Sequence, residues 1–245
     1  MQAPPRSTSA RRRLPKKWLG LTVALAAALV AGQPAVSSAA TYQLDYEFSI
    51  PVGALASSPA TVTLTDLGNN IRFSILNNLT GSKFKSLYFN FNGDSFGKDP
   101  DDLSFSNVKV NGATLSSSKY ETVLAPSESS TLSSLKADGD GYFDGKIAFK
   151  NSHFLAFGET LTFDLSLGGS RNLQESHFQH LSVPGPGGSP GPFLMAAHVQ
   201  NVNPAGDSHW VGPNPNPTPV PLPAAALLFG TGLAWVGRMA NRFKR

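Results

Sequence analysis

The sequence predicts an all-β fold, an antiparallel β-sandwich of jelly-roll type, and three observations lead to it. Apolar and polar side chains alternate with a period of two in many short runs, as in half-buried strands. Turns rich in glycine, asparagine and aspartate separate these runs. Between the two chain ends, no stretch repeats apolar residues at the 3.6-residue period of a capped helix. Short strands at this spacing are typical of sandwiches.

The first strand is expected over Tyr42–Ile50, where five apolar residues alternate with Gln43, Asp45, Glu47 and Ser49. The later runs have the same period and are bounded by turns such as Asn111-Gly112. In chain order, they predict strands over Thr61–Leu67, Ile71–Leu76, Ser86–Asn92, Phe105–Val110, Tyr120–Leu124, Tyr142–Phe149, Thr160–Leu167 and Phe193–Val202.

The chain of 245 residues is expected to divide into four parts: a signal peptide (1–40), the β-sandwich domain (41–212), a Pro/Asn linker (213–219) and a C-terminal sorting signal (220–245). A domain of this length is large enough for one hydrophobic core. Because the sequence has no cysteine, disulfides, thiol catalysis and thiolate metal sites are excluded.

The net charge of +4 conceals two opposite contributions. Ten of the 20 Lys and Arg residues lie in the terminal flanks, which contain no acid. The part of the chain between the flanks, called the body below, contains the other ten Lys and Arg residues and all 16 Asp and Glu residues. Its net charge is therefore −6. A nucleic-acid-binding domain needs a basic face, and this count argues against one.

Residues 1–40 have the three zones of a secretory signal: a basic stretch through Lys17, an apolar run over Trp18–Ala31, and small residues at the end. Cleavage is expected after Ala40 or Ala39, which makes Thr41 the first mature residue in the former case. The alternative is an N-terminal membrane anchor, but the run is short for one. Arg11-Arg12-Arg13 leaves both the general secretory and the twin-arginine route open.

The C-terminal end combines a proline-alternating spacer, a short apolar run and a basic tail. The spacer Asn214–Pro219 leads into Val220, Pro221, Leu222 and Pro223. The apolar run covers 224–237 and is expected to be one short transmembrane helix. The basic residues that follow are Arg238, Arg242, Lys244 and Arg245. By the positive-inside tendency this tail stays cytoplasmic and the body lies outside.

This arrangement over Val220–Arg245 resembles the PEP-CTERM sorting signal, which the membrane enzyme exosortase recognises in Gram-negative bacteria. The resemblance implies that Val220–Pro223 is the recognition element, that 224–237 is held transiently in the inner membrane, and that the basic end is its cytoplasmic stop. Leu222 departs from the archetype, which has a glutamate between the prolines. The alternative is a plain single-pass tail anchor with a proline linker.

One acidic turn is a candidate calcium site. Asp138, Asp140 and Asp144 lie in a glycine-rich segment, and closely spaced carboxylates can converge on Ca²⁺. The ligand set is incomplete, and a solvated β-turn explains the same residues. No other cofactor is expected.

No catalytic residue is predicted. Gly187–Gly191 matches the G-x-S-x-G pattern of a nucleophile elbow, but Pro190 lacks the N–H that the oxyanion hole requires. His177 and His180 are three residues apart, without a third ligand at zinc-site spacing. The chain is therefore not expected to be an enzyme.

The sequence predicts an exported, non-enzymatic protein of the cell surface or extracellular matrix, delivered by the export machinery and exosortase and associated with exopolysaccharide. The alternative is a calcium-assisted carbohydrate-binding module, for which Tyr88, Tyr120 and Trp210 are the candidate solvent-facing aromatics. A further alternative is a secreted hydrolase on the same scaffold.

Overall fold

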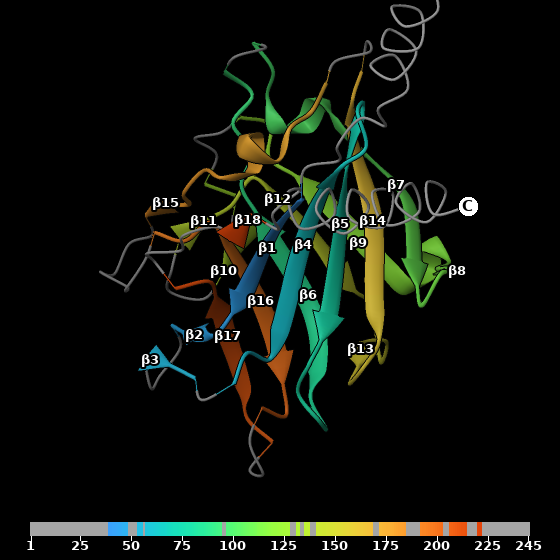
Figure 1. Cartoon of the computed structure of the whole chain (residues 1–245), viewed down its shortest axis with the longest axis vertical. Coiled ribbons are helices and arrows are strands. Elements are labelled where there is room, and N and C mark those ends of the chain that lie inside the picture. The colour runs from blue at the N-terminus through green and yellow to red at the C-terminus, as the bar shows by residue number, and fades with distance from the viewer. Residues whose placement is uncertain are drawn as a thin grey trace, which may run out of the picture. The chain divides into compact units, whose positions relative to one another are not determined.

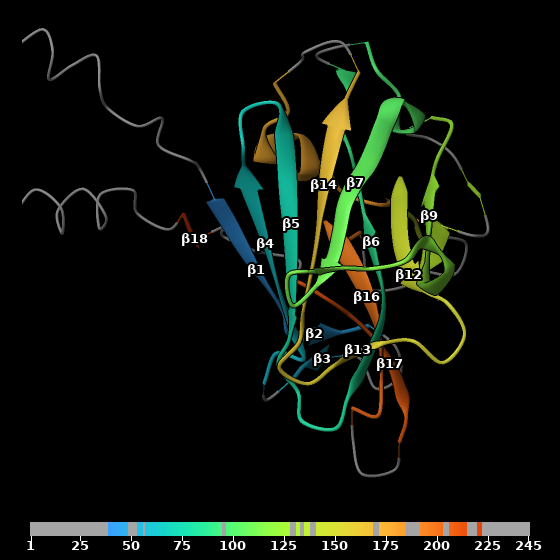
Figure 2. The ribbon, with the colours of Figure 1, turned by 90° about the vertical axis from the view of Figure 1, so that its right-hand side faces the viewer.

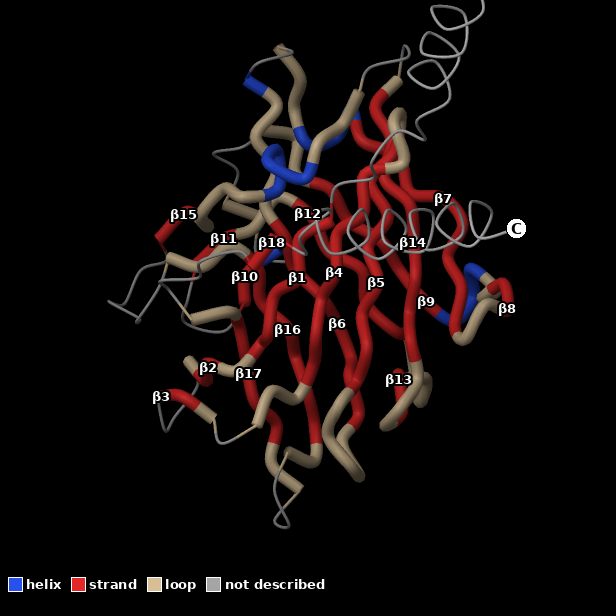
Figure 3. The backbone as a smooth tube through the Cα atoms, in the orientation of Figure 1, coloured by secondary structure: helices blue, strands red, loops and turns tan. Residues whose placement is uncertain are grey.

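The computed structural model describes residues 39–48, 53–55, 57–94, 97–127, 131–132, 135–137, 141–168, 172–184, 192–202, 206–214 and 220–221. Over these ranges the protein is all β, and its helices are short 3-10 turns (Figures 1 and 3). Two antiparallel sheets pack face to face, as Figure 2 shows. The predicted all-β sandwich is confirmed. The predicted transmembrane helix over 224–237 lies outside the described residues.

The seven-stranded sheet has the order β18-β1-β4-β5-β14-β7-β8. Its strands are β18 (Val220–Pro221), β1 (Ala39–Leu44), β4 (Ala60–Asp66), β5 (Asn70–Asn77), β14 (Thr160–Leu167), β7 (Leu103–Val110) and β8 (Ala113–Thr114). In β4, β5 and β14 the inward residues between the strand ends are apolar and almost completely buried, while the outward residues are mainly Thr, Ser and Asn. This alternation is the reason that one face of the sheet forms the core and the other meets solvent.

The eight-stranded sheet has the order β3-β2-β17-β16-β6-β12-β9, and β13 also pairs with β6. Its strands are β3 (Gly53–Ala54), β2 (Tyr46–Glu47), β17 (Ser208–Gly212), β16 (Met195–Gln200), β6 (Lys83–Phe89), β12 (Gly145–Phe149), β9 (Tyr120–Leu124) and β13 (Leu155–Ala156). A three-stranded sheet consists of β10 (Lys136–Ala137), β11 (Gly141–Tyr142) and β15 (Val183–Pro184).

Phenylalanine fills the space between the two large sheets. Phe73 of β5 stacks on Phe163 of β14 at 4.9 Å between ring centroids, and it meets Phe89 of the opposite sheet at 5.3 Å. Phe178, from the 3-10 helix η5 (Glu175–Phe178), contacts Phe73 edge-on at 5.2 Å. Each buried aromatic of this kind contributes about 1.5–3 kcal/mol, so the core compensates for the absence of disulfides.

Two predicted strands are divided in the structure. The first is interrupted at Asp45, where the chain passes from β1 of one large sheet to β2 of the other. In β1 the even-numbered residues are buried and Gln43 is exposed. In β2 the odd-numbered Glu47 is buried instead, so the buried side of the strand changes at this point. The predicted strand Tyr142–Phe149 likewise divides into β11 and β12. In both places the alternating pattern continues across the break, so the division could not be read from periodicity.

Candidate functional site

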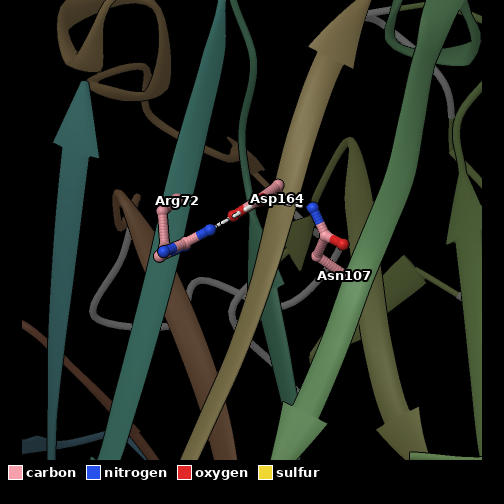
Figure 4. Close-up of polar contacts among 3 residues, drawn as sticks. All are labelled: Arg72, Asn107 and Asp164. Atoms are coloured by element: carbon pink, nitrogen blue, oxygen red, sulfur yellow. Dashed lines mark hydrogen bonds and ion pairs between the residues drawn. The ribbon is translucent and has the colours of Figure 1, made fainter. Parts of the chain in front are cut away.

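The outer face of the seven-stranded sheet carries one carboxylate that is almost inaccessible. Asp164 is in the outward phase of β14, yet only 2% of its surface is exposed. Its Oδ1 accepts a hydrogen bond from Arg72 Nε (2.7 Å), and its Oδ2 accepts one from Arg72 Nη2 (3.0 Å). Arg72 lies directly opposite Asp164 on β5, so a bidentate ion pair joins β5 to β14 (Figure 4).

Asn107 completes this network from the third strand, β7. Its Nδ2 donates to Asp164 Oδ2 at 2.8 Å. The ladder between β14 and β7 shifts register between Thr162 and Asp164, and Asn107 has a left-handed φ of 53°. A β-bulge of this kind re-aims a side chain, and Asn tolerates the conformation better than most residues. The bulge therefore allows Asn107 to face outward while the next residue, Val108, is buried in the core.

The network keeps Asp164 ionised. Burial by itself raises the pKa of the Asp164 carboxyl. The hydrogen bonds from Arg72 and Asn107, together with the positive charges of Arg72 and Lys109, outweigh that effect, and the pKa is below its ordinary value. The same hydrogen bond raises the pKa of Arg72. A hydrogen-bonded carboxylate with a lowered pKa is suited to orienting Arg72 and Asn107 and unsuited to proton transfer near neutral pH.

Arg72 and Asn107 keep hydrogen-bonding capacity for a ligand. The Arg72 side chain is 43% exposed, and its Nη1 group has no hydrogen-bond partner in the described residues. Asn107 is also exposed, with its amide oxygen beside the nitrogen that Asp164 holds. The site thus offers a fixed donor group and a fixed acceptor on an open sheet face.

Hydroxyl groups surround this network on the outer face. They cross the sheet in rows set by the strand register, and Thr41 and Thr63 hydrogen-bond across β1 and β4 at 3.2 Å. The residues are Thr41, Thr61, Thr63, Thr65, Ser74, Thr160, Thr162, Ser166, Ser104 and Ser106. Such a face can exchange hydrogen bonds with a polymer that is itself rich in hydroxyls.

The aromatic residues predicted for sugar binding do not present free ring faces. Tyr120 packs against the main core, and Tyr88 is only 8% exposed. Trp210 is half-buried on the outer face of the eight-stranded sheet. There its ring stacks on His198 at 4.9 Å and meets Tyr88 edge-on at 5.3 Å. Because neighbouring side chains already contact the ring of Trp210, it is a poor stacking platform.

Of the three predicted calcium ligands, only Asp144 is described. It is buried, and its Oδ2 accepts a hydrogen bond from the backbone N–H of Phe91 at 2.9 Å. This carboxylate therefore anchors the chain after β6. Asp138 and Asp140 lie outside the described residues. Within the described ranges, no group of three or more His, Asp or Glu residues is placed to hold a metal ion.

The residues predicted for processing lie at one edge of the seven-stranded sheet or outside the described part. Ala39, Ala40 and Thr41 begin β1, and Val220 and Pro221 form β18. Leu222, Pro223, Arg238, Arg242, Lys244 and Arg245 lie outside the described residues. Among the residues that are described, no helix has the length and apolar character needed to span a membrane.

No family model and no curated protein matches the chain. Solved structures with a similar arrangement include the CBM3a-L domain with flanking linkers from the scaffoldin CipA of the Clostridium thermocellum cellulosome. That domain is 15% identical, covers 73% of this chain and 95% of its own, and gives a TM-score of 0.29. A family IIIA CBD from Clostridium cellulolyticum is 13% identical. The match covers 66% of this chain and 90% of that domain, with a TM-score of 0.28. A scaffoldin carbohydrate-binding module of family 3b from Bacteroides cellulosolvens is 11% identical. The match covers 67% of this chain and 90% of that module, with a TM-score of 0.27. Similarity this low transfers no binding residue to this chain.

Sequence reasoning missed Arg72, Asn107 and Asp164. Asp164 and Arg72 are 92 positions apart and Asp164 and Asn107 are 57 apart, so only the strand register brings them together. One local signal existed. Phe105 and Val108 both point inward at a spacing of three, which indicates an extra residue in a strand of period two.

Proposed function

We propose that the domain is a non-enzymatic polysaccharide-binding module whose binding surface is the outer face of the seven-stranded sheet. The observation that carries this proposal is the network in which a buried Asp164 fixes an exposed Arg72 and an exposed Asn107. The solved carbohydrate-binding modules named above are too distant to support it.

Three properties of the face favour an extended polysaccharide over a small molecule. The donors and acceptors are spread over several strands, since hydroxyl side chains extend from β1 to β7. Arg72 and Asn107 are pre-oriented, so binding requires less ordering of side chains. Asp164 accepts hydrogen bonds on both oxygens, so it is unsuited to act as the acid or base of a hydrolysis.

Binding to a panel of immobilised polysaccharides, neutral and acidic, tests the proposal. Arg72→Ala and Asn107→Ala should each weaken retention by about tenfold or more, the size of one or two lost hydrogen bonds to a charged or pre-oriented group. Lys119→Ala is the matched control, because Lys119 is exposed outside this face, beside β9. Thermal melting of each variant verifies folding. If wild type and the two variants bind every polymer equally, or none, the proposal is wrong.

Delivery is the second part of the proposal. The secretory signal in residues 1–40 exports the chain, and the PEP-CTERM-like end, Val220–Arg245, passes it through exosortase to the cell surface or extracellular matrix. Intact-mass analysis of the exported protein should reveal the loss of residues 1–40 and of the tail after about Val220–Pro223. A mature protein that keeps its C-terminal arginines would contradict the sorting step.

A further inference from the structure

We infer that the ligand of this face is an acidic polysaccharide, a polymer that carries carboxylate groups among its hydroxyls. The inference rests on the proposed function and adds the chemical class of the ligand.

The accessible charge on the face is positive. Among the described residues, the outward positions of the seven-stranded sheet include three charged side chains: Arg72, Lys109 and Asp164. Asp164 is nearly inaccessible, and both of its oxygens accept hydrogen bonds from neighbours. A ligand approaching the sheet therefore meets the guanidinium of Arg72 and the ammonium of Lys109, although the body as a whole carries a net charge of −6.

The free side of Arg72 has the right shape for a carboxylate. Asp164 occupies Nε and Nη2, so Nη1 remains for a ligand. Arginine suits planar oxyanions, and the ion pair with Asp164 holds the guanidinium plane in place. A neutral sugar would accept a hydrogen bond from the same donor, but it would form no ion pair with the guanidinium.

Lys109 provides a second cation, at a distance from Arg72 that one extended polymer chain can span. It lies opposite Thr162, whereas Arg72 lies opposite Asp164 two residues further along the same strand. Two strand spacings and two residues separate the Cα atoms of Lys109 and Arg72 by about 12 Å. In the described residues Lys109 forms no ion pair with an acid. An extended chain with spaced carboxylates can contact both cations and the hydroxyl rows between them.

The small number of cations argues against a nucleic acid as the ligand. Nucleic-acid binding depends on neutralising many phosphates, and this face has two accessible cations, Arg72 and Lys109. A ligand with fewer charges and many hydroxyls matches Ser74, Thr162 and Ser106 around the two cations.

The test compares polygalacturonate with neutral hydroxyethylcellulose in affinity gel electrophoresis of the mature protein. Wild type should be retarded more strongly by polygalacturonate, and raising the salt from low to high ionic strength should weaken that retardation. Lys109→Gln removes one cation and none of the hydrogen bonds that join Arg72, Asp164 and Asn107. It should weaken polygalacturonate binding about two- to fivefold, the size of one exposed ion pair. It should weaken hydroxyethylcellulose binding less, because a neutral polymer forms no ion pair with a lysine.

Lys119→Gln is the charge-matched control, since it removes a cation outside this face. Equal retardation by the two polymers, or no effect of Lys109→Gln beyond that of Lys119→Gln, overturns the acidic ligand while the proposed function stands. No retardation by either polymer, together with no binding across the wider panel, overturns both.

Discussion

Thr41 of β1 lies directly opposite Val220 of β18, and Ala40 lies opposite Pro221. The residues that flank the predicted signal-cleavage site therefore pair with the first residues of the predicted sorting motif. β18 is the neighbour of β1 on the side away from β4, so it covers part of an edge strand. Exposed edges can pair with other chains, which gives this short contact a protective role.

Removing β18 should uncover that edge. A chain ending at Asn214 should melt about 2–4 °C below one ending at Pro221, because two backbone pairs contribute roughly 1 kcal/mol. It should also self-associate as its concentration rises, which sedimentation velocity measures. Thr41→Lys in the shorter chain should restore the monomer, since an edge lysine opposes strand pairing. If the two chains melt at the same temperature and both remain monomeric, the role of β18 is contradicted.

Asp164→Asn should destabilise the domain by about 1–3 kcal/mol at pH 7, because it removes the charge from three hydrogen bonds. The folded-state pKa of Asp164 is below its unfolded value of about 3.9. Its contribution is therefore complete above the unfolded pKa and is lost as the pH falls through the folded one. Urea denaturation at pH 7, 4 and 2.5 should show the difference between variant and wild type shrinking with acid. Asp101→Asn, at an exposed position, is the control. A difference that stays constant with pH would show that Asp164 does not titrate as described.

The regular strands could be predicted from their alternating residues, and β4, β5 and β14 each have one buried face. β9 and β14 have the predicted bounds, and β4 and β5 agree within one residue at each end, with Val62, Phe73 and Phe163 inward as expected. β17 was missed because only five residues form it and their alternation includes a buried histidine, His209. The site could not be predicted, because Arg72, Asn107 and Asp164 meet through strand register, which local periodicity does not encode. The spacing of Phe105 and Val108 indicates the bulge but not the residues that face it.

Gly145→Ala should disturb the centre of the core. A Cβ at Gly145 would collide with the ring of Phe89, which is fully buried against Phe73 and Phe178. Overpacking of this kind costs about 1–3 kcal/mol, and equilibrium urea denaturation measures it. Gly168→Ala is the matched control, since no atom lies within 4 Å of its Cβ position. Phe89→Leu should recover part of the loss in the Gly145→Ala background. Equal stability of the two alanine variants would contradict the close approach of β12 to Phe89.

Glu47 and His209 form a buried pair, and replacing only one of them should lower the free energy of unfolding. Glu47 Oε2 lies 2.5 Å from His209 Nδ1, and the two side chains are 3% and 10% exposed. His209→Leu should cost about 1–3 kcal/mol, because Glu47 loses one buried hydrogen-bond partner. Glu47→Met with His209→Leu should cost less than the sum of the two single changes, since apolar side chains need no partner there. Urea denaturation of the four proteins of this cycle at pH 7 gives the coupling energy. A coupling energy near zero would mean that the short contact between Glu47 and His209 contributes nothing to stability, and that the packing of β2 against β17 holds the two side chains together instead.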